Sequence, residues 1–191
     1  MDHCLGWTWF IACMMQFYFV SPVFILMLRK NWKIGVAFVV ACIAASMVTT
    51  GVLTVNYGLP STYLGPASVN TTDTGIDHIY TKPYTRISPF LVGVLLGYYF
   101  AVTKNRRVKI NPFVVVVSWL LSITVALLVV FGLIDHYSNI LDPNYKSVLS
   151  KAIYNSCARF AWSLTIAWTI FACATGNGEF NIKQGFRKLK A

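Results

Sequence analysis

Five long apolar segments, separated by polar or charged stretches, dominate the hydrophobic pattern of this chain. Runs of aliphatic and aromatic residues that hardly any charge interrupts predict helices that cross a membrane. We expect the spans at 9–28, 34–55, 89–102, 113–134 and 158–175. The pattern therefore predicts an all-α fold, a polytopic membrane helix bundle with about five transmembrane helices.

The third segment is unusual, because the polar, proline-containing stretch 80–88 runs directly into it. If Ser88 caps the helix and Pro89 is its first residue, the apolar run holds about 14 residues, roughly 21 Å. That is too short for a bilayer core of roughly 30 Å. Either the helix extends back to about Tyr84, or 80–88 lies non-helical at membrane depth, and both place Arg86 at the membrane edge. Polar backbone there needs cover from protein or a water-filled cavity, so we expect this segment to face the bundle interior and to mark the functional site.

Composition supports the membrane assignment. The 191 residues are 57% hydrophobic and 12% charged, with a mean hydropathy of +0.61, whereas an ordinary soluble domain is roughly 25% charged. The net charge of +10 would suit a nucleic-acid-binding protein. However, the 16 Lys and Arg residues are spread over short loops and the tail, and form no single basic face. We therefore predict no nucleic-acid partner.

The distribution of positive charge predicts the orientation. Most Lys and Arg residues fall in the first-to-second loop, the third-to-fourth loop and the basic tail 177–191, which follows the transmembrane domain 1–176. The opposite side holds Lys82, Arg86, Lys146, Lys151 and Arg159. By the positive-inside rule, the N-terminus is lumenal or extracellular and the C-terminus is cytoplasmic. The glycosylation sequon at Asn70 agrees, because it lies in the long loop 56–86 that this topology places outside.

Arg86 and Arg159 are the strongest candidates for a binding function, because an arginine costs ~2.5 to 3.5 kcal/mol at the centre of a membrane helix. In the predicted topology both lie at the outer boundary. One interpretation is that each side chain extends to the lipid headgroups. The other is that both face a cavity and bind an anionic or polar group of a substrate. Tyr84, Asp77 and His78 are close enough in sequence to Arg86 to join such a site.

The remaining reactive residues form no recognisable motif. His3, His78 and His136 lack the spacing of metal ligands, which favours loop histidines without a catalytic role. We therefore predict no metal and no bound cofactor. Cys4 and Cys157 fall at the outer ends of spans, where a disulfide is chemically permitted. The sequence leaves open whether the two meet in space.

Gly93 and Gly97 form a G-x-x-x-G motif in the third span, which allows another helix to approach closely. Packing within the bundle is the simpler interpretation, and a dimer interface is the alternative. Neither interpretation assigns a function by itself.

Three stretches resemble a known membrane family. They are 4–9 with 16–17 and 21–22; 82–86, continuing through 91–98; and 157–162, continuing through 167–173 to Gly176. In these stretches the chain resembles the acyltransferase 3 family, and within it the animal branch similar to the nose-resistant-to-fluoxetine proteins. The sequence K-P-Y-T-R-I, which starts at Lys82, is the most specific part of the likeness.

The resemblance implies a membrane enzyme that transfers acyl groups, other than aminoacyl groups, from a donor such as acyl-CoA to an acceptor at the membrane. Arg86, Tyr84 and Arg159 would then line the acceptor side of the cavity. The family's domain has more spans than this chain, and its proposed catalytic histidine lies in an early helix that none of the three histidines here matches. We therefore expect a partial domain, a fragment or truncated product whose general base belongs to the upstream half of the same domain.

Besides that upstream half, the expected partners are the lipid bilayer and an acyl acceptor or lipid. The alternative function is a non-catalytic, transport-related membrane carrier for lipids or small hydrophobic molecules. A third interpretation is a remnant without function. An upstream segment that carries a histidine in its first span would favour the enzyme over the carrier.

Overall fold

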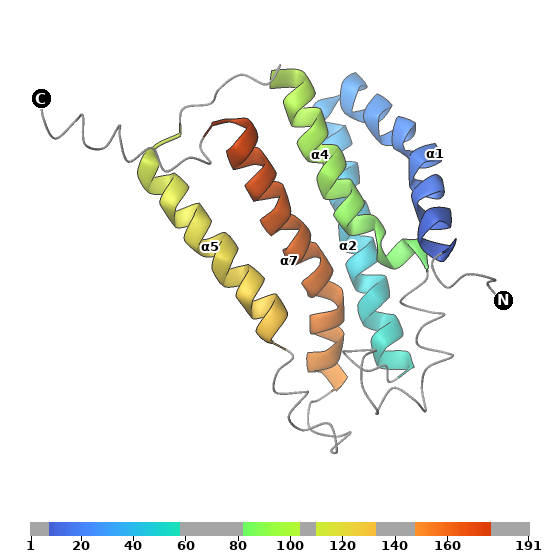
Figure 1. Cartoon of the computed structure of the whole chain (residues 1–191). Coiled ribbons are helices and arrows are strands. Elements are labelled where there is room, and N and C mark those ends of the chain that lie inside the picture. Colours follow the sequence, from blue (N-terminus) through green and yellow to red (C-terminus); the bar gives the residue numbers. More distant parts are fainter. Residues whose placement is uncertain (1–7, 58–81, 104–109, 133–147, 177–191) are drawn as a thin grey trace, which may run out of the picture.

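The structure describes residues 8–57, 82–103, 110–132 and 148–176. In these ranges the computed structural model contains five α-helices and one short 3₁₀ helix (Figure 1). The elements are α1 (Thr8–Lys30), α2 (Trp32–Asn56), η3 (Pro83–Thr85), α4 (Ile87–Thr103), α5 (Pro112–Phe131) and α7 (Val148–Ala174). The predicted all-α membrane helix bundle is confirmed.

The helices α1, α2, α5 and α7 are long and apolar enough to cross a membrane. The helix α4 has 17 residues, or about 26 Å, which is short of a bilayer core of roughly 30 Å. The 3₁₀ helix η3 lies directly before it and adds about 6 Å at ~2 Å per residue. The third span is therefore completed by η3 and α4 together.

The start of α4 differs from the prediction. The helix begins at Ile87, so Ser88 is not its cap and Pro89 is its third residue. Proline is accommodated there because the first N–H groups of a helix have no partner within it. Since residues 83–85 are already helical, the structure is closer to the alternative in which the helix extends back to about Tyr84. A break at Arg86, which has φ −112° and ψ −1°, separates the two pieces.

Consecutive helices run in opposite directions across the bundle (Figure 1). The helices α2, α4 and α7 pack against one another in the middle, α1 packs on α2 and α4, and α5 packs on α7. One end of the bundle, where α1, α4 and α7 begin and α2 and α5 end, also holds η3. We call this the η3 end.

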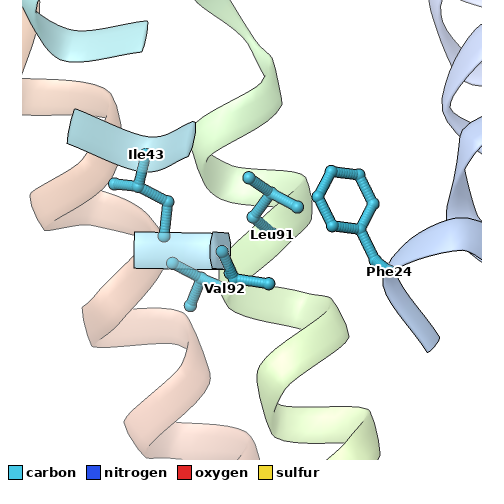
Figure 2. Packing of buried hydrophobic residues seen from close by; sticks show 5 residues of the cluster. Phe24, Ile43, Leu91 and Val92 are labelled. Atoms are coloured by element: carbon cyan, nitrogen blue, oxygen red, sulfur yellow. The ribbon is translucent and has the colours of Figure 1, made fainter. Parts of the chain in front are cut away.

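The hydrophobic core lies where α1, α2 and α4 meet. Figure 2 shows Leu91 of α4 between Phe24 of α1 and Ile43 of α2, with Val92 beside it. Leu91 is completely buried. Nearer the η3 end, the rings of Phe17 and Phe90 stack with their centroids 5.0 Å apart. These contacts fix α4, and with it the turn at η3, between α1 and α2.

The helices α1 and α2 form a hairpin that is joined by the single residue Asn31. The backbone N–H of Gly35 donates to the carbonyl of Asn31 at 2.8 Å. A Cβ atom on Gly35 would lie 2.7 Å from the Cα of Leu28, closer than packed atoms can approach. Glycine is therefore required at this position for the two helices to pack so tightly beside the turn.

The prediction for the fifth span was wrong at its start. The helix α7 begins at Val148, well before residue 158. Its first turns carry Lys151, Asn155 and Ser156, and these polar residues concealed the helix in the hydrophobic pattern. Its end was predicted correctly, because Gly176 follows the helix with a left-handed φ of +76° that favours glycine.

The helix α5 is the most exposed of the five, and none of its residues is buried. Its first turn is capped by the side chain of Asn111, which accepts a hydrogen bond from the N–H of Phe113 at 3.1 Å. The hydroxyl of Tyr154 on α7 donates to the carbonyl of Val129 at 2.7 Å and ties the end of α5 to α7.

Gly93 and Gly97 do not pack against another of the described helices. No atom outside the backbone of their own helix lies within 4 Å of a Cβ built on either residue. The simpler prediction, packing within the bundle, therefore fails for the helices that the structure describes. The dimer interface stays a prediction.

Candidate functional site

The turn at η3 brings polar backbone against the middle of α2, since its partner Ser46 lies ten residues before the end of that helix. A separate donor serves each of its four successive carbonyl groups. The carbonyl of Lys82 accepts from the hydroxyl of Thr85 at 3.0 Å, and that of Pro83 accepts from the N–H of Arg86 at 3.0 Å. The carbonyl of Tyr84 accepts from the hydroxyl of Ser46 on α2 at 2.7 Å. The carbonyl of Thr85 accepts from Nη1 of Arg159 on α7 at 3.4 Å.

This arrangement explains how irregular polar backbone can be part of the third span. An unsatisfied backbone group in hydrocarbon costs several kcal/mol. Here Ser46 and Arg159 reach the turn from two different helices and supply the donors that the turn lacks. The irregular backbone is covered by the bundle, as predicted.

A line of buried hydroxyl groups connects Ser46 with the η3 end of α2. The hydroxyl of Thr50 donates to the carbonyl of Ser46, and the hydroxyl of Thr54 donates to the carbonyl of Thr50, both at 2.8 Å. The side-chain amide of Asn155 on α7 donates to the hydroxyl oxygen of Thr54 at 3.4 Å. We call Ser46, Thr50, Thr54 and Asn155 the polar seam. It places hydrogen-bonding groups between two apolar helices that hydropathy alone would treat as uniform.

Arg86 follows η3, and its side chain lies over α1. Its guanidinium carbon is 4.5 Å from the centre of the Trp9 ring, a cation–π distance. The residue is half-buried. A guanidinium held on an aromatic face is a suitable group to bind a carboxylate, thioester oxygen or phosphate, because its donors form a planar fork.

Tyr84 presents its phenol at the surface of the same turn, with 38% of the residue exposed. A tyrosine phenol, with an ordinary pKa of about 10, is protonated at neutral pH and can donate a hydrogen bond. The main chain of Tyr84 is held by Ser46, so the side chain projects from a fixed point.

The three residues predicted for substrate binding all lie in or against the turn at η3. Tyr84 and Arg86 belong to the turn itself, and Arg159 contacts it from α7. Arg159 directs at least one guanidinium nitrogen to the backbone of Thr85, so part of its role is to hold the turn. Both arginines are half-buried.

Several predicted residues lie outside the described part of the chain. They are the glycosylation site Asn70, the cysteine Cys4, the histidines His3, His78 and His136, and Asp77. Cys157 is exposed on α7, but its predicted disulfide with Cys4 stays a prediction. Within residues 8–57, 82–103, 110–132 and 148–176, no three His, Cys, Asp or Glu residues form a group that could hold a metal ion.

Sequence reasoning missed Ser46 and Asn155 as parts of the site. A serine inside an apolar run is compatible with many positions, and Asn155 was assigned to a loop. One signal was available: Ser46, Thr50 and Thr54 recur at every fourth residue, which places three hydroxyl groups on one face of a helix.

Comparison with known families agrees with the stretches on which the resemblance rests. Residues 1–187 match the acyltransferase 3 family, which is described as "acyltransferase domain". The chain belongs to the acyltransferase 3 family. The resemblance inferred from the K-P-Y-T-R-I stretch and its companions is thereby confirmed.

Two curated proteins of Caenorhabditis elegans are similar to this acyltransferase 3 chain. Nose resistant to fluoxetine protein 6 is 29% identical over 93% of the chain and 22% of its own length. Regulator of hypoxia-inducible factor 1 is 30% identical over 76% of the chain and 30% of its own length. The aligned part of the chain thus spans less than a third of either relative. No solved structure matches it.

Proposed function

We propose that the chain is part of a multi-pass membrane acyltransferase that transfers acyl groups, other than aminoacyl groups, from a donor such as acyl-CoA to an acceptor at the membrane. Membership of the acyltransferase 3 family supports the reaction class. The observation that carries the assignment of the site is the turn at η3. There Ser46 and Arg159 hold the backbone, and Arg86 and Tyr84 project from it.

Some residues at the turn bind the substrate, and others position the turn. Arg86 binds an anionic or polar group of the substrate through its guanidinium fork, and Trp9 keeps that fork in place. Tyr84 donates a hydrogen bond from its neutral phenol to the same substrate. Arg159 lines the site and holds the carbonyl of Thr85, so it acts partly through the turn.

Acyl transfer also needs a base within ~2.6 to 3.2 Å of the proton that leaves the acceptor. The aligned part of the chain spans less than a third of either relative. We propose that the base comes from the upstream half of the same domain, which packs against the bundle in the bilayer. Helices that fold separately can associate in this way in a membrane.

The test of the site is a pair of substitutions at Arg86 in a product that contains both halves. Arg86→Ala should abolish acyl transfer while expression persists, and Arg86→Lys should restore little, because an ammonium lacks the bidentate fork. Acyl transfer is measured with a labelled acyl-CoA in membranes. Ser46→Ala should give an intermediate loss, since it loosens the turn but leaves the arginine in place.

Lys33 is a matched control for Arg86. Its ammonium lies 5.8 Å from the centre of the Trp32 ring, away from η3, so it reproduces a cation on an aromatic face without the turn. Lys33→Ala should leave acyl transfer unchanged. Full activity of Arg86→Lys would refute the binding role and favour headgroup contact instead, whereas lipid movement without acyl transfer by the intact protein would favour the carrier.

We further propose that the η3 end faces the lumen or the outside and that the C-terminus is cytoplasmic. The positive-inside rule and the sequon at Asn70 support this orientation. In a glycosylation-competent membrane the protein should carry one glycan, and Asn70→Gln should remove it. A tag after Ala191 should resist added protease in sealed right-side-out vesicles. Cleavage of that tag from outside would reverse the proposed orientation.

A further inference from the structure

The helix α1 bends part-way along its length (Figure 1), and Pro22 lies inside it. Proline has no N–H, so the carbonyl of Tyr18, four residues earlier, loses the donor that a regular helix would supply. The hydroxyl of Ser21 donates to that carbonyl at 2.9 Å in its place. A proline and a side-chain donor thus interrupt the backbone ladder at 18–22, and such a break is where a helix kinks. We call 18–22 the hinge.

The half of α1 that follows the hinge is anchored on α2. Phe24 is buried in the core, and the centre of its ring lies 5.7 Å from that of Phe38 on α2. Leu28 is completely buried and packs against Gly35 beside the one-residue turn. Residues 23–30 can therefore move only together with α2.

The half of α1 that precedes the hinge lies against the candidate site. The ring of Trp9 lies over the guanidinium of Arg86. The ring of Phe17, on the same side of the helix, stacks on that of Phe90 in α4. Residues 8–17 therefore cover Arg86 and the start of α4, and we call them the cover.

The opposite side of the cover faces away from the other described helices. Phe10, Ile11 and Met14 are each half exposed or more, in a helix that is long and apolar enough to cross a membrane. The turn that precedes Arg86 lies against Ser46, ten residues or about 15 Å from the end of α2. Movement of the cover away from α4 would therefore open Arg86 toward lipid rather than toward bulk water.

We propose that the cover swings about the hinge and opens an entrance between α1 and α4, through which a membrane-dissolved amphiphile reaches Arg86. Its anionic head pairs with the guanidinium, and its hydrocarbon chain lies along Phe17 and Phe90. When the cover returns, Trp9 again lies over the guanidinium and encloses the head. This inference rests on the proposed binding role of Arg86 and adds the class of substrate and its route.

The movement is measured in a product that contains both halves of the domain, as distances between spin labels placed by amber suppression. One label replaces Met14 on the cover, and the other replaces Leu121 on α5, at the far side of the bundle (Figure 1). This distance should show two populations. When the first label replaces Leu26 in the anchored half instead, the distance should show one.

Two neighbouring substitutions should shift these populations in opposite directions. Pro22→Ala restores the backbone donor for the carbonyl of Tyr18 and should deplete the open population. Ser21→Ala removes the remaining donor and should enlarge that population. Neither residue is buried, so both variants should keep the packing of α1 on α2.

The class of substrate is tested with a diazirine-bearing fatty acid, whose carboxylate is a simple anionic head. Illumination in membranes should label 8–17 and 87–94, because the chain of the probe lies in the entrance. Arg86→Gln and Pro22→Ala should each remove that label, whereas Lys33→Gln, which changes a cation on an aromatic face elsewhere, should leave it. An excess of butyrate, the same head without a membrane-soluble chain, should not displace the probe.

Each other outcome has a definite meaning. A single distance population that neither Pro22→Ala nor Ser21→Ala changes would overturn the hinge. Displacement of the probe by butyrate would assign Arg86 to a water-soluble anion, and equal labelling of α5 would indicate bulk lipid contact, so both would overturn the entrance. Acyl transfer without the expected populations and label would keep the proposed function and remove the entrance. The expected populations and label without acyl transfer would do the reverse.

Discussion

The helices α2 and α5 are both long and strongly apolar, yet the structure uses them in opposite ways. α2 has six buried residues, Gly35, Val39, Ile43, Ser46, Thr50 and Thr54, which recur every three or four positions along one face. α5 has none. Three of the six carry hydroxyl groups, and the polar seam that they build reaches the turn at η3. The difference teaches that hydropathy assigns a helix to the membrane, whereas small and hydroxylated residues at helical spacing assign a face to the protein interior.

The largest effect is expected when one isoleucine from each helix is replaced. Ile43 is 7% exposed in the core, and Ile123 on α5 is 50% exposed. Ile43→Ala should lower the free energy of unfolding by about 2 kcal/mol, at the low end for such cavities because lipid surrounds the protein. Ile123→Ala should change it little. Equal losses, measured by steric trapping in bicelles, would show that α5 is as well packed as α2.

A matched pair of threonines tests the polar seam. Thr54 is fully buried, donates to Thr50 and accepts from Asn155, whereas the exposed Thr124 donates only to the carbonyl of Leu120 in its own helix. Thr54→Val should cost about 1 kcal/mol, because it removes one interhelical bond and leaves a buried donor less well satisfied. Thr124→Val should be neutral within error. If Thr54→Val left the free energy of unfolding unchanged, the polar seam would not contribute to stability.

The smallest effect is expected where α5 meets α7. Tyr154→Phe removes the hydrogen bond to the carbonyl of Val129, which should cost about 0.5 to 1 kcal/mol. Trp119→Phe on α5 serves as its control, since the buried indole nitrogen of Trp119 has no hydrogen-bond partner among the described residues. A loss for Trp119→Phe as large as that for Tyr154→Phe would mean that packing, and not the hydrogen bond, joins the two helices. Both are measured as shifts of the thermal midpoint in detergent.

Much of the fold follows from the sequence because lipid imposes one simple rule, that apolar runs of sufficient length become helices. The rule located all five helices, but it placed the start of α7 too late. Lys151, Asn155 and Ser156 belong to this helix, and its polar side chains find partners in the bundle or at its surface. It also could not set the start of α4, because the apolar run begins only after Ser88 and Pro89, whereas the helix begins at Ile87.

The candidate site was predicted in part for a similar reason. Arg86 and Arg159 could be predicted because charge is costly in hydrocarbon, and Tyr84 lies close to Arg86 in the sequence. Ser46 carries no charge, and its importance comes from the carbonyl of Tyr84, 38 positions away along the chain. Contacts of that kind depend on how helices pack, which a hydrophobic pattern does not encode. The face of α4 that bears Gly93 and Gly97 was misjudged on the same grounds.

The one-residue turn at Asn31 also determines how the protein enters the membrane during synthesis. Arg29, Lys30 and Lys33 surround the turn, and carrying each across the hydrocarbon would cost ~2.5 to 3.5 kcal/mol on insertion scales. With no linker beyond Asn31 and with Gly35 packed against Leu28, α1 reaches its final packing only together with α2. In the proposed orientation, the two helices would therefore partition into lipid as one helical hairpin, with the cationic turn retained on the cytoplasmic side. A bulky residue at position 35 would consequently act first as a defect of biogenesis.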